Sequence, residues 1–243
     1  MLGLSGFGFL AHAAEPPTLR ALEPFSATYK VKRGVASAEM KQSLQFDGGQ
    51  WLAETSLRAR GVLSLFAGGT ATERSWMAPA GDAFHSLRYQ SVDEISRDKH
   101  RINADFDWEQ GVVTGRFDET HFSHPIEQRL DDRVSLQYAL MVALEQGRRP
   151  DQLQVLHEDG IRSLDVRYLE PKKIKVPAGT YEAIGISYQR QGSSRMTTMW
   201  CAEALGFLPV VIEQTKQGKR RFRARLTSYQ PAVPTSSPAA SEN

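Results

Sequence analysis

The chain has 243 residues, of which 40% are hydrophobic and 24% are charged, and its formal net charge at pH 7 is +2. This composition is ordinary for a globular protein, and the length suits one domain such as a β-sandwich or barrel. The net charge argues neither for nor against nucleic acid as a partner. The lone Cys201 excludes an internal disulfide, and we expect it to be a small core residue.

The N-terminal sequence MLGLSGFGFLAHAAEPP has features of an export signal. Residues 2–10 are mostly apolar but too few to cross a bilayer as a helix, and Ala11-His12-Ala13 fits the small-x-small cleavage rule. We expect a signal peptide over residues 1–13, a linker over residues 14–24, and a periplasmic protein. The signal is atypical because no Lys or Arg precedes Arg20, and the alternative is a disordered N-terminus. No later stretch approaches a membrane helix in length, so we expect a protein that does not span the membrane.

From Phe25 onward, apolar and polar side chains alternate along most of the chain. The apolar members of FSATYKV share one face, and WLAETSLRA repeats the pattern after the turn Asp47-Gly48-Gly49. This period of two is typical of half-buried antiparallel strands. Similar segments between Gly- and Pro-containing turns predict roughly ten or more strands, mostly joined as hairpins. The expected fold is mostly β, with a large antiparallel sheet that forms a barrel or half-barrel over residues 25–230. A sandwich is the alternative.

One segment breaks the alternation. The sequence SLQYALMVALEQ follows Asp131 and Asp132 and precedes Gly147. An acidic start, good helix formers and a glycine stop predict a helix over about residues 133–146. Leu136 and Leu140 belong to one stripe, and other apolar residues extend around it. Because a helix this apolar must be covered on most sides, we expect it to pack on the concave face of the sheet.

Two other segments do not fit the strand pattern. Residues 61–69, GVLSLFAGG, are apolar and bracketed by glycines. The simpler interpretation is a buried connection, and the functional one is a mobile hydrophobic lid that includes Val62, Leu65 and Phe66. The tail over residues 231–243, PAVPTSSPAASEN, has no core-forming pattern, and we expect it to be disordered.

Motifs of catalysis and metal binding are not found. The sequence contains no Walker loop, dinucleotide fingerprint, nucleophile elbow, paired CxxC or HExxH. His121 and His124 are three residues apart, so in a strand they point to opposite faces and cannot share one metal ion. We expect no catalytic residue, no metal site and no cofactor.

Adjacent carboxylates occur at three places along the chain. They are Asp93-Glu94, Asp131-Asp132 and Glu158-Asp159. Acid–base chemistry needs two carboxyl groups held at a fixed distance in a cleft. Each of these pairs stands next to a turn or a helix start, so solvation and capping explain them better.

The most asymmetric charge lies in KRRFRARLTSY near the C-terminus. Alternation predicts one strand face that carries Lys219, Arg221, Arg223 and Arg225. The simpler interpretation is a solvated face of an edge strand, where basic residues oppose edge-to-edge aggregation. The alternative is contact with an anionic surface such as lipid phosphate. Nucleic acid is not expected, because the protein is exported and the arginines are not interleaved with exposed aromatic residues.

Three segments, DDRVSLQYALMVALEQG, KVPAGTYEAIGI and MWCAEALGFLPVVIEQ, in this order resemble a proteobacterial exported family, domain of unknown function 3108. The resemblance runs from about Phe25 to Tyr229. It implies an envelope protein with a mostly β fold and supplies no catalytic residues. Asp132 would cap the helix, and Cys201 stands where we expect a small apolar residue. The expected architecture is also similar to that of periplasmic lipoprotein and lipid carriers.

These observations lead to three hypotheses on function. The first is a non-catalytic periplasmic protein that binds a lipid or other apolar envelope ligand, because the inward apolar surface exceeds what one short helix covers. The second is a structural module of the envelope with a filled core and a protein partner, and the third is a hydrolase without a local motif. The residues expected to line the ligand site are Tyr29, Met40, Trp51, Val62, Leu65, Phe66, Phe106, Trp108, Leu136 and Leu140.

Overall fold

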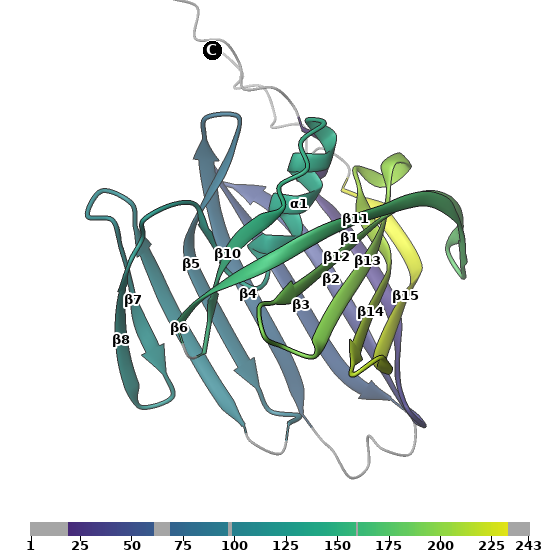
Figure 1. Ribbon diagram of the computed structural model, residues 1–243, viewed down its shortest axis with the longest axis horizontal. Helices are drawn as coiled ribbons and strands as arrows, with labels where there is room; N and C mark the ends of the chain where they lie inside the picture. Colours follow the sequence, from purple (N-terminus) through teal and green to yellow (C-terminus); the bar gives the residue numbers. More distant parts are fainter. Residues whose placement is uncertain (1–18, 61–68, 97–98, 159, 233–243) are drawn as a thin grey trace, which may run out of the picture.

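The computed structural model describes residues 19–60, 69–96, 99–158 and 160–232. They form a mostly β fold with one α-helix, α1 (Ser135–Glu145), as the alternation predicts (Figure 1). The strands are β1 (Phe25–Arg33), β2 (Ala36–Asp47), β3 (Gln50–Arg60), β4 (Thr70–Ala80), β5 (Ala83–Asp93), β6 (His100–Asp107), β7 (Val112–Phe117), β8 (Thr120–Pro125), β9 (Leu130–Asp131), β10 (Gln152–His157), β11 (Gly160–Val176), β12 (Gly179–Arg190), β13 (Arg195–Ala202), β14 (Leu208–Lys216) and β15 (Lys219–Pro231). The described residues also form the short 3-10 helices η1 (Arg20–Leu22) and η3 (Glu203–Leu205).

All the strands belong to one 15-stranded sheet in the order β8-β7-β6-β5-β4-β3-β2-β1-β15-β14-β13-β12-β11-β10-β9. Sequential neighbours pair antiparallel as hairpins, β15 returns to pair with β1, and only β9 and β10 are parallel. The sheet curls around α1, but its end strands β8 and β9 are not joined by a ladder (Figure 1). One continuous sheet makes the fold an open, barrel-like structure and not a two-sheet sandwich.

Alternation along the strands decides which side chains enter the core. On β1 the apolar residues Phe25, Ala27, Tyr29 and Val31 are buried, and the polar residues between them are exposed or half-buried. Because neighbouring strands pair in register, this face continues across the sheet and forms the concave surface. The face predicted for β1 is confirmed.

Helix α1 packs on the concave face, as predicted, and its bounds differ from the expected 133–146 only at the ends. Asp132 caps its first turn, because its Oδ1 atom accepts the backbone N–H groups of Val134 and Ser135 at 2.8 and 2.9 Å. Gly147, at φ 69°, follows the last turn. The described residues contain no helix long and apolar enough to cross a membrane.

The end of the segment expected to be a linker, residues 14–24, packs against the core. Ala21 and Leu22 of η1 are buried, and the backbone N–H groups of Arg20 and Ala21 donate to the Glu145 carboxylate at 2.9 and 2.8 Å. These contacts hold η1 against the end of α1. The expected signal peptide over residues 1–13 and residues 233–243 of the expected disordered tail lie outside the described residues.

Candidate functional site

The concave side of the sheet divides into two halves that differ in exposure. In the first, which we call the filled half, α1 packs against the sheet. Leu140 shares an apolar cluster with Ile186 of β12 and Met199 of β13. Every residue of α1 from Ser135 to Leu144 is buried. This half is therefore occupied by side chains of the protein itself.

The other half, which we call the open half, keeps inward side chains that are only partly buried. The Gln42 amide donates to Gln137 of α1 over 3.0 Å, which shows that this face of β2 points inward. Met40 lies on the same face and pairs with Leu57 of β3, and both are half-buried. Solvent therefore reaches the concave side of the sheet here. Tyr188 of β12 directly follows the buried Ser187 and packs against the Leu140 cluster, so it belongs to the filled half.

A group of charged side chains, the lumen ion-pair cluster, lies beside the open half. The Arg133 guanidinium is 3.0 Å from a Glu73 carboxylate oxygen and 3.4 Å from a Glu158 oxygen. Tyr89 donates its hydroxyl to Glu73 over 3.1 Å, and His100 Nε2 is 3.4 Å from Glu158. The Glu73 carboxylate holds the pKa of Arg133 above its ordinary value. The cluster joins β4 and β6 to the segments that follow β9 and β10.

Two adjacent carboxylates before α1 are fully buried, so the expected solvation of Asp131 and Asp132 is wrong, whereas the expected capping is confirmed. Burial raises the pKa of Asp132 to about 6, although Ser75 donates a hydrogen bond to it over 2.6 Å. Burial also raises the pKa of Asp131, which is 2.9 Å from the Arg129 guanidinium. Both carboxylates make polar contacts at the junction between β9, α1 and the sheet. This role depends on tertiary contacts, so the sequence alone could not predict it.

Four of the residues expected to line a ligand site belong to the core. Tyr29 and Leu140 are 0% exposed, and Leu136 and Phe106 are buried. The Tyr29 hydroxyl donates to the carbonyl of Pro209 over 2.9 Å, which satisfies it within the protein. These side chains line the filled half.

Three further expected residues, Met40, Trp51 and Trp108, are half-buried and pack against the core cluster that contains Tyr29 and Phe106. The half-buried Trp51 donates its indole N–H to the Leu22 carbonyl over 3.0 Å, and Trp108 donates to the Ser86 carbonyl over 2.7 Å. Met40 lies in the open half. The last three expected residues, Val62, Leu65 and Phe66, lie outside the described residues. The seven described residues lie in or against the apolar core, and the role of the expected residues in binding stays a prediction.

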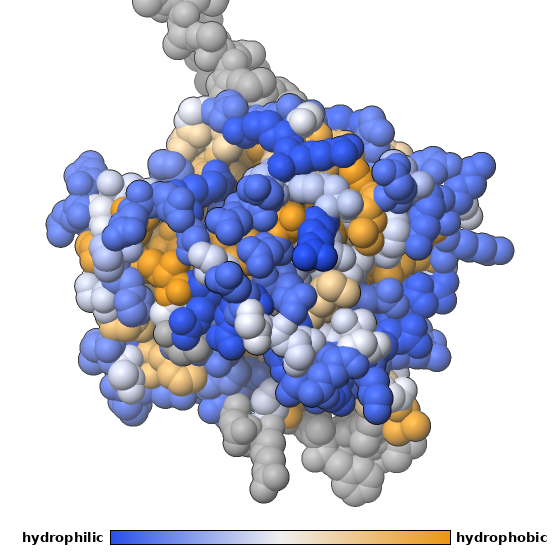
Figure 2. Space-filling model, in the orientation of Figure 1, coloured by the Kyte–Doolittle hydropathy of each residue, from blue (hydrophilic) through white to orange (hydrophobic). Residues whose placement is uncertain are grey.

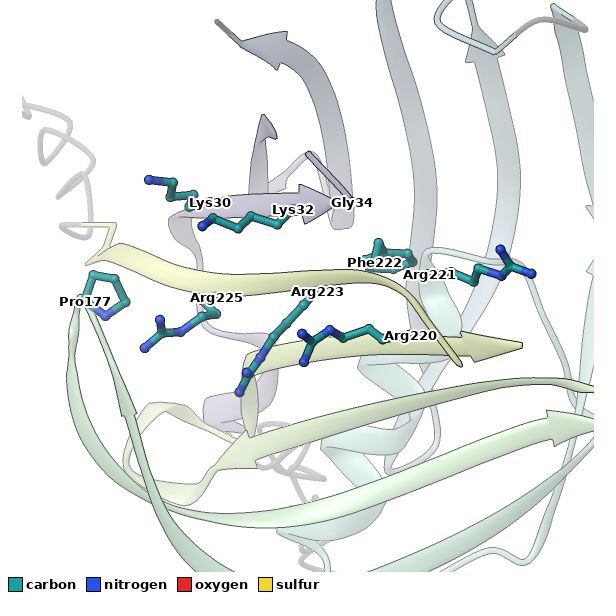
Figure 3. Close-up of a pocket in the computed structure, with 9 residues that line it drawn as sticks. All are labelled: Lys30, Lys32, Gly34, Pro177, Arg220, Arg221, Phe222, Arg223 and Arg225. Atoms are coloured by element: carbon teal, nitrogen blue, oxygen red, sulfur yellow. The ribbon is translucent and has the colours of Figure 1, made fainter. Parts of the chain in front are cut away.

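A second candidate site lies on the convex face of β1 and β15, where a pocket of about 560 Å³ has mostly basic walls. Its lining residues are Lys30, Lys32, Gly34, Pro177, Arg220, Arg221, Phe222, Arg223 and Arg225. We call this pocket the basic groove. Figure 3 shows Lys30, Lys32, Arg223 and Arg225 extending toward the side on which Pro177 lies, whereas Arg221 extends in the other direction.

The composition of this basic face corrects two expectations. Lys219 does not line the groove and Arg220 does, because a bulge opposite Gln214 and Thr215 inserts one extra residue into β15 and shifts the alternation. The strand is also not an edge strand, since β15 pairs with both β1 and β14. Protection of an exposed edge therefore does not explain its arginines.

The groove concentrates positive charge. Among the carboxylates of the described residues, only Glu213 approaches it closely, at 3.1 Å from Arg223 and 3.4 Å from Arg220. Within the described parts of the chain, no carboxylate lies within ion-pair distance of Lys30, Lys32, Arg221 or Arg225. Alternation in FSATYKV and the residue after it predicts an outward face for Lys30 and Lys32, but sequence reasoning missed their role because the pairing of β1 with β15 joins opposite ends of the chain.

The two histidines of β8 and Cys201 lie in surroundings that are typical of structural residues. On β8, His121 is exposed and His124 stacks on Phe122, and no group of metal-ligating side chains occurs among the residues described. Cys201 is fully buried, and burial raises the pKa of its thiol well above the ordinary value. It acts as a core residue, as predicted.

The sequence of this chain matches a known protein family. The model of a family described as a protein of unknown function, DUF3108, matches residues 25–225. The chain belongs to this family. The resemblance inferred from three segments is confirmed, and the match covers nearly all of the sheet in this DUF3108 protein. No curated protein matches the sequence.

Solved structures share the fold. A β-barrel-like DUF1849 protein from Brucella abortus has a TM-score of 0.58 at 11% identity, over 87% of this chain and 99% of that one. A candidate lipoprotein from Parabacteroides distasonis has a TM-score of 0.35 at 9% identity, over 86% and 95% of the two chains. A candidate exported protein with a YmcC-like fold from Bacteroides fragilis has 0.35 at 12%, over 86% and 96%. The first of these likenesses supports the barrel-like fold of this DUF3108 protein, and the other two carry no argument.

Proposed function

We propose that this DUF3108 protein is a non-catalytic binding protein of the periplasm that holds a lipid-like, amphipathic ligand in the open half. The observation that carries the proposal is the division of the concave side. Helix α1 fills one half, and the other keeps Met40 and Leu57 partly exposed. Apolar surface left in water costs roughly 25 cal/mol per Å², so a bound apolar group would be stabilised there.

The chemistry of the open half favours an amphipathic ligand over a plain hydrocarbon. Met40 and Leu57 offer apolar surface, and Arg133 of the lumen ion-pair cluster offers polar groups. A guanidinium carries five N–H donors, so donors remain for a ligand beyond the contacts with Glu73 and Glu158. The Gln42 Oε1 atom is a buried acceptor without a partner in the described residues. Because such an acceptor costs roughly 1–3 kcal/mol, a ligand that donates to it would offset that cost.

A structural or interaction module of the envelope is the second candidate. The full burial of α1 favours it, because the filled half needs no ligand to complete it. In the described part of the chain, the large exposed hydrophobic residues are Val35, Phe46, Leu169 and Met196. Figure 2 shows separate apolar patches on a mostly hydrophilic face, whereas a protein-docking surface is expected to be contiguous. We therefore rank this function below ligand binding.

The proposal is tested on protein purified without detergent. We expect organic extraction and mass spectrometry to find a stoichiometric lipid, and a fluorescent fatty-acid probe to bind saturably. Leu57→Asp should weaken probe binding about ten-fold or more, because a carboxylate would enter the apolar surface. Ser56→Asp, on the opposite face of the same strand, is the matched control and should bind the probe like the wild type. No extracted lipid together with no saturable probe binding would leave the structural module as the better function.

A further inference from the structure

We propose that the basic groove is a second ligand site, on the opposite face of the sheet from the open half, and that it binds a phosphate-bearing group. This proposal is independent of the one for the open half. It depends on positive charge on the convex face of the sheet, whereas the other depends on partly exposed side chains on the concave face. Three features of the groove carry the inference: the register of its cations, its walls, and its shortage of counter-ions.

The register of β1 and β15 places like charges directly opposite each other. Lys30 pairs with Arg225, and Lys32 pairs with Arg223. Like charges at opposed positions of an antiparallel pair destabilise a sheet. Two such pairs side by side are therefore unfavourable unless an anion shares them.

The protein supplies little of that negative charge itself. Glu213 contacts Arg220 and Arg223. Glu39 stands opposite Lys30 on β2, but its carboxylate is bound to Arg60 at 2.7 Å. The groove thus gathers six basic side chains around one contacting carboxylate, an excess larger than the net +2 of the whole chain. Such a local excess attracts anions from solution.

The turn between β11 and β12 makes the basic surface a pocket. Pro177 of this turn lines the groove, and the Ala178 N–H donates to the Leu226 carbonyl of β15 over 3.2 Å. The Arg225 guanidinium donates to the Lys175 carbonyl over 2.9 Å, which anchors the same turn. The resulting volume of about 560 Å³ lies within the range of pockets that hold small ligands.

The donor set favours phosphate. Arginine presents a planar fork of N–H groups that matches phosphate oxygens in pairs, and lysine adds a point charge. With Arg223 and Arg225 on one strand and Lys30 and Lys32 on the next, donors of both kinds surround the pocket (Figure 3). The phosphate could belong to a lipid headgroup or to a soluble compound, and the experiment separates these sources.

The test compares two arms at low ionic strength, where screening is weak. In the first, calorimetry measures binding of pyrophosphate, and in the second, sedimentation measures binding to vesicles of phosphatidylglycerol mixed with phosphatidylcholine. We expect binding in at least one arm, and a loss of about ten-fold or more in the double variant Lys30→Gln/Lys32→Gln. Both lysines are exposed, so this variant should fold, and Arg223→Gln/Arg225→Gln should show the same loss.

The matched control is Lys216→Gln/Lys219→Gln. It removes the same charge from β14 and β15, and its residues pair with each other without lining the groove. Pyrophosphate binding that only the groove variants lose identifies a soluble ligand, and vesicle binding alone identifies a lipid headgroup. No binding in either arm, or an equal loss in the control, would overturn the proposal. Neither outcome changes the fatty-acid probe result in the open half, so the two proposals fail separately.

Discussion

The filled half and the open half of the concave side are crossed by the same strands but are stabilised differently. On β4, Met77 is fully buried in the filled half, whereas Glu73 lies in the open half with its side chain 21% exposed. Apolar packing against α1 completes the first, and ion pairs around Arg133 hold the second. The difference teaches that one curved sheet can provide a rigid core and an accessible surface on the same face.

Polar contacts mark the boundary between the halves. Ser75 donates to Asp132, Ser86 donates to Ser135, and Gln42 donates to Gln137, all at buried positions. A buried donor or acceptor is costly without its partner. These hydrogen bonds therefore fix where the apolar helix lies on the apolar sheet. We infer that these contacts stop α1 from sliding into the open half.

The largest effect is expected from Leu140→Ala, which should destabilise the protein by about 2–5 kcal/mol because it leaves a cavity in the filled half. Leu57→Ala, in the open half, should cost about 1 kcal/mol or less, because that side chain is only half-buried. Denaturant unfolding measures both, and an unchanged m-value supports the comparison. Equal losses would mean that the two halves do not differ in packing.

Asp132→Asn tests the boundary through pH. The pKa of folded Asp132 is raised from 3.8 to about 6, so folding favours its protonated form. Its contribution to wild-type stability is complete below pH 4 and is lost as the pH rises through about 6. From pH 4 to 7 the wild type should lose roughly 2–3 kcal/mol relative to the variant, which does not titrate there. Parallel curves of unfolding free energy against pH would show that Asp132 stays protonated or charged throughout.

A smaller effect, on reactivity instead of stability, separates the halves directly. A maleimide should label Leu57→Cys rapidly in the native state, because solvent reaches that position. Cys201 of the filled half should react only on unfolding, since it is buried and burial raises the pKa of its thiol. Wild-type protein is the control for Cys201. Rapid native labelling of the wild type would contradict the assignment of Cys201 to a closed core.

The sequence by itself determined the local structure. Period-two alternation identified strands such as β1 and β3, and the run between Asp132 and Gly147 identified α1 to within two residues at each end. These features depend on neighbours in the chain, because backbone geometry repeats every two or 3.6 residues. The family could be named from the sequence for the same reason, since three local segments carry it.

Only the tertiary structure decided how these pieces combine. Strand order brought Lys30 and Lys32 of β1 beside Arg223 and Arg225 of β15, and a bulge replaced Lys219 by Arg220 in the groove. The burial of the Asp131-Asp132 pair and the division of the concave side also required contacts between distant segments. Alternation gives the face of a residue but not the partner strand or the depth at which a helix packs. Those depend on long-range pairing and packing, which leave no local pattern in the sequence.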